Sequence, residues 1–231
     1  MAGLGGYARY AIYWAPERGS WLEAFGASWL GRDAEAGEQR MQPRLGLPVA
    51  ELTAAPARYG FHATLKPPFA LAEGRDPADL DRALGAFAAT TAPVEAPALA
   101  ADAALGFVAL RPGGAAPALD AFALSVVEAF EPFRAPATPE EIAKRRAPGL
   151  TPLQEAMLAR YGYPYVGEEF RFHVTLTGPV DAAMGARVVE EVGPLAAPHL
   201  DDPFRLSEIS LFGDPGRGAP FRLIRRYPLT G

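Results

Sequence analysis

The stretch FHATL at residues 61–65 recurs as FHVTL at residues 172–176, and this repetition decides how the chain is organised. The chain has 231 residues and only three histidines, two of which occupy these matched settings. Identity at four of five positions, around two of the three histidines, indicates an internal repeat rather than chance. The two copies are therefore interpreted as corresponding parts of one site.

Each copy has the composition of a β-strand, in which alternate side chains point to opposite faces. On the first strand, His62 and Thr64 share one face, with Lys66 next in line. The Pro-Pro pair at 67–68 and the Gly-Pro pair at 178–179 are expected to end the two strands. The corresponding face of the second strand carries Arg171, His173 and Thr175. Two such strands side by side would bring two imidazoles and two hydroxyls to one cavity.

Composition limits the classes of function. A hydrophobic content of 49% supports a sizeable core, and the net charge of −5 weighs against a non-specific polyanion binder. A small anion in a local pocket remains compatible with that charge. Cysteine is absent, which excludes disulfides and thiolate metal sites and makes a cytoplasmic location the expectation. We also expect no membrane association, because the sequence shows no leader and no apolar run of bilayer length.

The predicted elements follow the same order in both halves: strand, helix, histidine strand, helix, strand. We expect one bilobal domain over 1–231, with pseudo-repeat halves at about 7–104 and 105–231. The predicted fold is α+β, with a pseudo-two-fold arrangement of two antiparallel sheets, outer helices and a groove between the lobes. The expected helices lie at 20–30, 76–90, 117–130 and 181–192, and the expected strands at 9–15, 61–65, 99–103, 106–110, 172–176, 204–212 and 221–226.

The main departure from symmetry is a segment near residues 136–163. It contains two capping boxes, which begin at Thr138 and Thr151, each followed by proline and then by an acid or amide three residues after the threonine. This pattern predicts a helical hairpin inserted in the second half.

The longer strings around the motifs resemble a known group. RYGFHATLKPPF at 58–69 and FRFHVTLTG at 170–178 are similar to the two-histidine phosphoesterase superfamily, and most similar to bacterial proteins encoded with phosphonate-metabolism genes. The insert resembles that group at 138–140 and 162–166, so the resemblance covers most of the chain. It implies activity on cyclic phosphates or 2'-5' linkages, although some members mainly bind RNA or nucleotides.

The motif residues suit the opening of a cyclic phosphodiester. That reaction needs a base for water, an acid for the leaving oxygen and donors for the non-bridging oxygens. Imidazole has a pKa near 6.5, so His62 and His173 are candidate acid and base in either order, with Thr64 and Thr175 as donors. No cofactor or metal is expected, because His199 is distant and predicted to be a loop residue, which leaves no usual ligand set. For one copy alone, a structural histidine at a sheet edge is the alternative.

Four cations are candidates for substrate binding. Lys66 and Arg171 would reach the phosphate if they lie on the cleft face, and otherwise they are solvent-exposed residues near the ends of strands. Arg145 and Arg146 would bind a second phosphate if the insert folds over the groove. The alternative is a solvated cationic end of the first insert helix.

We therefore expect a metal-independent hydrolase of a small cyclic phosphodiester, either a sugar or a nucleotide cyclic phosphate. A phosphoribosyl cyclic phosphate of phosphonate catabolism is one such substrate. Two alternatives stay open: a module that binds a nucleotide or phosphosugar without turnover, and an RNA 2'-5' ligase or RNA-end phosphodiesterase. The expected partner is a small phosphorylated substrate, and a nucleic acid is expected only as a short RNA end. The sequence does not determine the oligomeric state.

Overall fold

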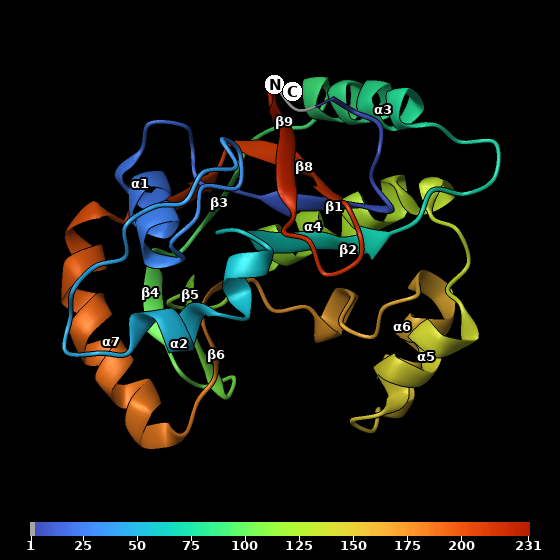
Figure 1. The fold of residues 1–231 in the computed structure, drawn as a ribbon. Helices are drawn as coiled ribbons and strands as arrows, with labels where there is room; N and C mark the ends of the chain where they lie inside the picture. The colour runs from blue at the N-terminus through green and yellow to red at the C-terminus, as the bar shows by residue number, and fades with distance from the viewer. Residues whose placement is uncertain (1–2) are drawn as a thin grey trace.

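Seven strands form one antiparallel sheet in the order β4-β5-β6-β2-β1-β8-β9 in the computed structural model, which describes residues 3–231 (Figure 1). The strands of this sheet are β1 (Arg9–Trp14), β2 (Ala63–Phe69), β4 (Leu99–Asp102), β5 (Phe107–Pro112), β6 (Val174–Pro179), β8 (Glu208–Asp214) and β9 (Arg222–Pro228). A separate two-stranded sheet pairs β3 (Val94–Ala96) with β7 (Phe204–Leu206).

The large sheet consists of two lobes that meet where Ala63 of β2 lies opposite Val174 of β6. The first lobe contains β9, β8, β1 and β2, and the second contains β4, β5 and β6 (Figure 1). Each lobe takes strands from both halves of the chain: β8 and β9 complete the first lobe, and β4 belongs to the second. The fold is α+β with antiparallel strands, as predicted, but the lobes do not coincide with the halves at 7–104 and 105–231.

Helices α1, α3, α5, α6 and α7 begin after residues whose side chains cap them. Side chains of Ser20, Asp76 and Asp181 accept the first-turn N–H groups of α1, α3 and α7. Thr138 and Thr151 form complete capping boxes on the two insert helices, which confirms the predicted hairpin. The helices are α1 (Trp21–Trp29), α2 (Val49–Thr53), α3 (Pro77–Ala89), α4 (Pro117–Ala129), α5 (Pro139–Arg146), α6 (Pro152–Tyr161) and α7 (Ala182–Ala196).

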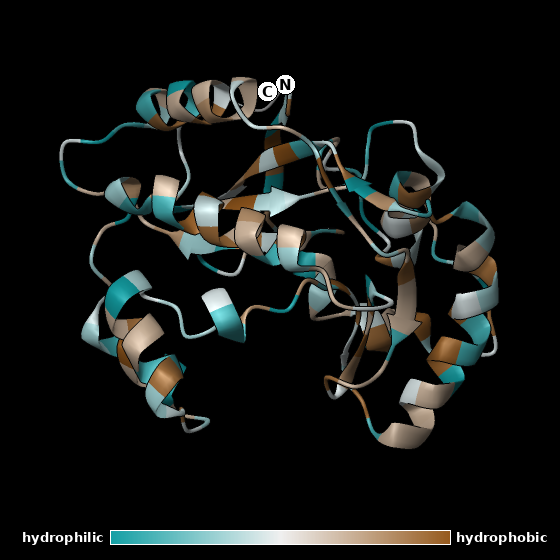
Figure 2. Cartoon of the chain, turned by 180° about the vertical axis from the view of Figure 1, so that it is seen from behind, coloured by the Kyte–Doolittle hydropathy of each residue, from teal (hydrophilic) through white to brown (hydrophobic). Residues whose placement is uncertain are grey.

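Helices surround the sheet on several sides. In Figure 1, α3 lies above the first lobe, α7 runs beside the second lobe, and α5 and α6 stand apart as the insert hairpin. Figure 2 shows apolar residues concentrated on strands and on parts of α7, whereas α5 is mostly polar. Helix α1 is fixed to the second lobe because the buried Trp29 indole donates a 2.7 Å hydrogen bond to the Leu176 carbonyl. One contiguous core therefore supports both lobes.

Three details of the sequence prediction were wrong. Strand β2 does not end at the Pro-Pro pair but continues to Phe69, because irregularities in its register with β1 accommodate residues that cannot donate to a regular ladder. The stretch between residues 31 and 60, in which no helix or strand was predicted, contains α2. Both motif histidines lie immediately before their strands, so the strands begin at Ala63 and Val174.

Candidate active site

The register between the lobes brings the two motifs together. Ala63 lies opposite Val174. Continued by one step in each direction, this antiparallel register would set His62 opposite Thr175 and Thr64 opposite His173. Side chains of directly opposed residues on one face lie about 5 Å apart at Cβ, and diagonal neighbours lie about 7 to 8 Å apart. The two imidazoles are diagonal neighbours in this register. This pairing therefore brings both histidines and both threonines to the junction of the two lobes.

Both imidazoles are held in the same way. The Nδ1 atom of His62 lies 2.8 Å from the Gly60 carbonyl, and that of His173 lies 2.7 Å from the Arg171 carbonyl. A carbonyl only accepts, so in each ring Nδ1 carries the proton and Nε2 is the chemically available nitrogen. The Nε2 atom of His62 lies 3.3 Å from the Thr64 hydroxyl. The matching Nδ1 contacts of the two rings support the interpretation of the motifs as a repeated half-site.

The surroundings of the two histidines lower both pKa values. His62 stacks on Tyr13 with a ring separation of 3.9 Å, and burial together with the nearby His173 lowers its pKa to about 4, against the opposing effect of the Gly60 carbonyl. Burial also lowers the pKa of His173, and Arg111 adds to that effect while the Arg171 carbonyl opposes it. Both rings are therefore neutral in the free protein near neutral pH, and His62 takes up a proton only in acid.

The two larger cavities beside the paired motifs differ in character. The first has a volume of about 460 Å³, contains Thr64 and His173 in its wall, and is otherwise largely apolar and aromatic. The second has a volume of about 430 Å³ and contains His62, Thr64 and Thr175. Thr64 and Tyr163 line both cavities, so the two hollows adjoin at the motifs. The arrangement suits a ligand with a phosphate at the motifs and further groups on either side.

Lys66 does not lie where the alternation of the strand predicts. Thr64 pairs with Tyr13 of β1, but Lys66 pairs with the adjacent Ile12, so one extra residue bulges out of β2 between them. The bulge turns Lys66 into the interior, where its side chain is 2% exposed and its Nζ atom lies 2.8 Å from Glu131 Oε2. The assignment of Lys66 to substrate binding was therefore wrong, and its role is in the core.

The other candidate cations are placed differently from one another. Arg171 lines the first cavity with His173, but its guanidinium donates to the carbonyls of Glu168 and Phe170. Arg145 lines the second cavity, 4.7 Å above the Tyr163 ring.

Arg146 points elsewhere and forms a bidentate ion pair with Glu155 on the second insert helix, so its assignment to substrate binding was wrong. It lies one residue after Arg145 on a helix, where adjacent residues face different directions. His199 stacks on Trp21 at a ring separation of 4.3 Å in a short turn after α7, outside both cavities.

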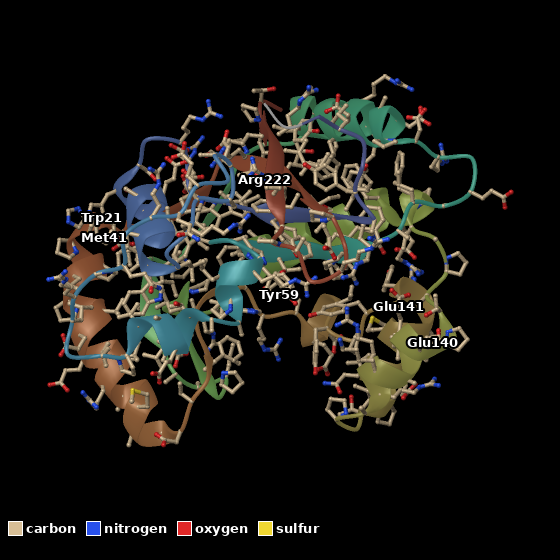
Figure 3. All side chains as sticks on the ribbon, viewed as in Figure 1. Trp21, Met41, Tyr59, Glu140, Glu141 and Arg222 are labelled. Carbon is tan, nitrogen blue, oxygen red and sulfur yellow. The ribbon has the colours of Figure 1, made fainter. Side chains whose placement is uncertain are left out.

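Sequence reasoning missed the residues that complete the second cavity. Arg9 and Arg58 line it from the first lobe, and Tyr59, labelled in Figure 3, lies beside His62 with a ring separation of 6.3 Å. The buried Asp214 holds both arginines, with an oxygen 2.6 Å from Arg9 and another 3.5 Å from Arg58. Arg9 lies four residues before Tyr13 on β1, a spacing that favours a shared face. Its link to Asp214, 205 positions away, has no signal in the sequence.

Within residues 3–231, no group of three or more His, Cys, Asp or Glu side chains is arranged to hold a metal ion. Across the same residues, every helix is too short or too polar to cross a lipid bilayer.

Two facing His-x-Thr motifs at the junction of two antiparallel lobes define an α+β protein with a paired-histidine site. The chain belongs to the family described as "Protein of unknown function (DUF1045)", which matches residues 64–222. A similar solved structure is that of E. coli LigT complexed with NADP+, with 13% identity, a TM-score of 0.44, and coverage of 98% of this chain and 100% of that chain.

Two curated relatives are named "Ribose 1,5-bisphosphate phosphokinase PhnN". The protein from Janthinobacterium sp. (strain Marseille) is 37% identical over 235 residues, which cover 96% of this chain and 51% of the relative. That from Laribacter hongkongensis (strain HLHK9) is 36% identical over 227 residues, with 94% of this chain and 51% of the relative covered. The chain thus spans about half the length of each of these relatives.

Proposed function

We propose that this chain is a phosphoesterase that hydrolyses a small cyclic phosphodiester to a monoester, with the two His-x-Thr motifs as its catalytic groups. The observation that carries the proposal is the pairing of Ala63 with Val174, which brings the two motifs side by side where the lobes meet. The matched hydrogen bonds at Nδ1 leave an Nε2 atom of each ring for proton transfer. One phosphate bound at the junction would be within reach of both rings.

The roles follow from the protonation of the two rings. His62, with its pKa lowered to about 4, is neutral over most of the pH range, so its Nε2 atom takes the proton from the attacking water. The water oxygen bonds to phosphorus while one ring P–O bond breaks. His173 Nε2 then gives a proton to the leaving oxygen, and the negative charge of a bound phosphate favours the protonated form that this step requires. The hydroxyls of Thr64 and Thr175 donate to the non-bridging oxygens.

The names of the relatives suggest the class of substrate. Those proteins are named for a kinase of ribose 1,5-bisphosphate, which makes a phosphorylated ribose that carries a cyclic phosphate a reasonable substrate for this chain. The sequence contains no Gly-x-x-x-x-Gly-Lys-Ser/Thr loop for a nucleoside triphosphate, and its two lysines are Lys66 in the core and Lys144 on the insert. These features of the chain favour phosphoester hydrolysis over phosphoryl transfer as its activity.

Phosphorus NMR on a panel of ribose and nucleoside cyclic phosphates, with and without chelator, tests the proposal. We expect a cyclic phosphate signal to be replaced by a monoester signal, at an unchanged rate when chelator is present. His62→Ala and His173→Ala should each lower turnover by about 10² or more, whereas His199→Ala, outside the cavities, serves as the matched control. Measurable binding with unchanged spectra would instead support a non-catalytic binding module, and loss of turnover on chelation would point to metal-dependent hydrolysis.

A further inference from the structure

The second cavity is strongly cationic in a chain whose net charge is −5. Its only acidic lining residue among those the structure describes is Glu141, whose carboxylate accepts the Thr138 N–H in the capping box of α5. Five cationic side chains line the same hollow: Arg9, Arg58, Arg134, Lys144 and Arg145. Such a concentration of positive charge requires anions, and the protein supplies carboxylates to only some of these groups.

Two of the five cations are already neutralised. Arg9 lies 2.6 Å from an oxygen of Asp214, and Arg134 donates two N–H groups to Oε1 of Glu131. The other carboxylate oxygen of Glu131 accepts a hydrogen bond from the buried Lys66, which holds the Glu131 side chain in place. Arg9 and Arg134 therefore stabilise the cavity wall and have little remaining positive charge to offer a ligand.

Less of the positive charge is neutralised on the other three cations. Lys144 and Arg145 form no ion pair with any residue in the range 3–231, although both lie on the cavity side of α5. Arg58 approaches Asp214 only to 3.5 Å and stacks near the Tyr59 ring. Arg58 comes from the first lobe and the other two from the insert, so the three cations converge on one hollow from opposite sides.

The position of the insert is itself fixed. Helix α6 ends at Gly162, which adopts a left-handed conformation with φ of 67°, and Arg134 packs against it so closely that an added Cβ would lie 2.8 Å from the guanidinium. Tyr163 follows Gly162 in the sequence and lines both cavities. The Arg145 guanidinium lies over the Tyr163 ring, 4.7 Å from its centre. These contacts hold the insert against the rest of the protein next to the paired histidines. Lys144 and Arg145 therefore line the second cavity.

We propose that Arg58, Lys144 and Arg145 form a subsite for a second phosphate, so that the preferred substrate carries a terminal phosphate monoester as well as the cyclic phosphodiester. This inference rests on the proposed function for the position of the cyclic phosphate at the histidines. It extends that function by assigning the cationic cavity to a separate, dianionic group. The apolar first cavity offers no comparable charge to such a group.

The test compares ribose 1,2-cyclic phosphate with and without a 5-phosphate. Dissociation constants are measured by calorimetry in the His62→Ala background, so that binding is observed without turnover. We expect the 5-phosphate to tighten binding about tenfold or more, since charge-assisted hydrogen bonds from two or three cations contribute to it. Adding Arg145→Gln or Lys144→Gln should reduce this preference severalfold.

Arg146→Gln is the matched control. It removes the same charge one residue along the same helix, from a side chain that pairs with Glu155 outside the cavity, so the preference should persist. Circular dichroism checks that each variant is folded. An equal affinity for the two ligands, or an equal loss of preference in Arg146→Gln and Arg145→Gln, would overturn the subsite. A preserved preference without hydrolysis of either ligand by the wild-type chain would refute the proposed function and leave the second-phosphate subsite standing.

Discussion

Acidification should destabilise the folded chain through His62. The folded protein holds this ring neutral down to a pKa of about 4, whereas in the unfolded chain the imidazole titrates near 6.5. Between these values the unfolded chain binds a proton that the folded chain does not, so stability is lost as pH falls through this range and is fully present above it. A pKa difference of this size corresponds to roughly 3 kcal/mol, most of which arises from burial of the ring against Tyr13.

The contribution is measured by comparing the wild type with His62→Gln, which keeps a polar side chain but cannot titrate. Urea unfolding from pH 7 to pH 4 gives the free energy of unfolding of each protein, and the other titrating groups cancel in the difference between them. The stability of the wild type relative to the variant should fall by about 3 kcal/mol over this range. A difference that stays constant with pH would show that His62 is not held neutral by its surroundings, and the role of this ring as the base would lose its physical basis.

Three further predictions concern the core, the insert and the threonines. Lys66→Ala should lower the free energy of unfolding by about 2 to 4 kcal/mol because it breaks the buried ion pair with Glu131, which then keeps only Arg134 as a partner. Chemical denaturation would detect a smaller loss if the lysine were solvated. Gly162→Ala should cost about 1 to 2 kcal/mol, since the left-handed backbone disfavours a Cβ, and an unchanged melting temperature would contradict the conformation assigned to this cap. Thr64→Val and Thr175→Val should each lower kcat by about 10- to 100-fold with the substrate found by phosphorus NMR, and retention of full activity would remove the hydroxyls from the mechanism.

The sequence correctly predicted features that depend only on residues close together in the chain. The alternation of His62 with Thr64, and of His173 with Thr175, depends only on the local period of two and agrees with the placement of these residues at the cavities. The caps at Thr138 and Thr151 were likewise predicted correctly because the capping box is a contact between residues three apart.

Prediction failed where the pairing of distant strands determined the outcome. The bulge that turns Lys66 into the core exists only because β2 pairs with β1, and no residue of the motif predicts it. Asp214 arranges Arg9 and Arg58 from the far end of the chain, and the exchange of β4, β8 and β9 between the lobes is equally non-local. Arg146 was indistinguishable from Arg145 in sequence, because the direction of each around α5 depends on how the insert docks.

The most direct test of the account is NMR of the three histidines during titration with inorganic phosphate. With only three imidazoles in the chain, carbon-13 labelling gives a simple spectrum in which point substitutions assign each signal. If both motifs serve one phosphate, the signals of His62 and His173 should move together with a single dissociation constant, while the signal of His199 stays in place. Movement of only one motif histidine, or two clearly different dissociation constants, would contradict the shared site.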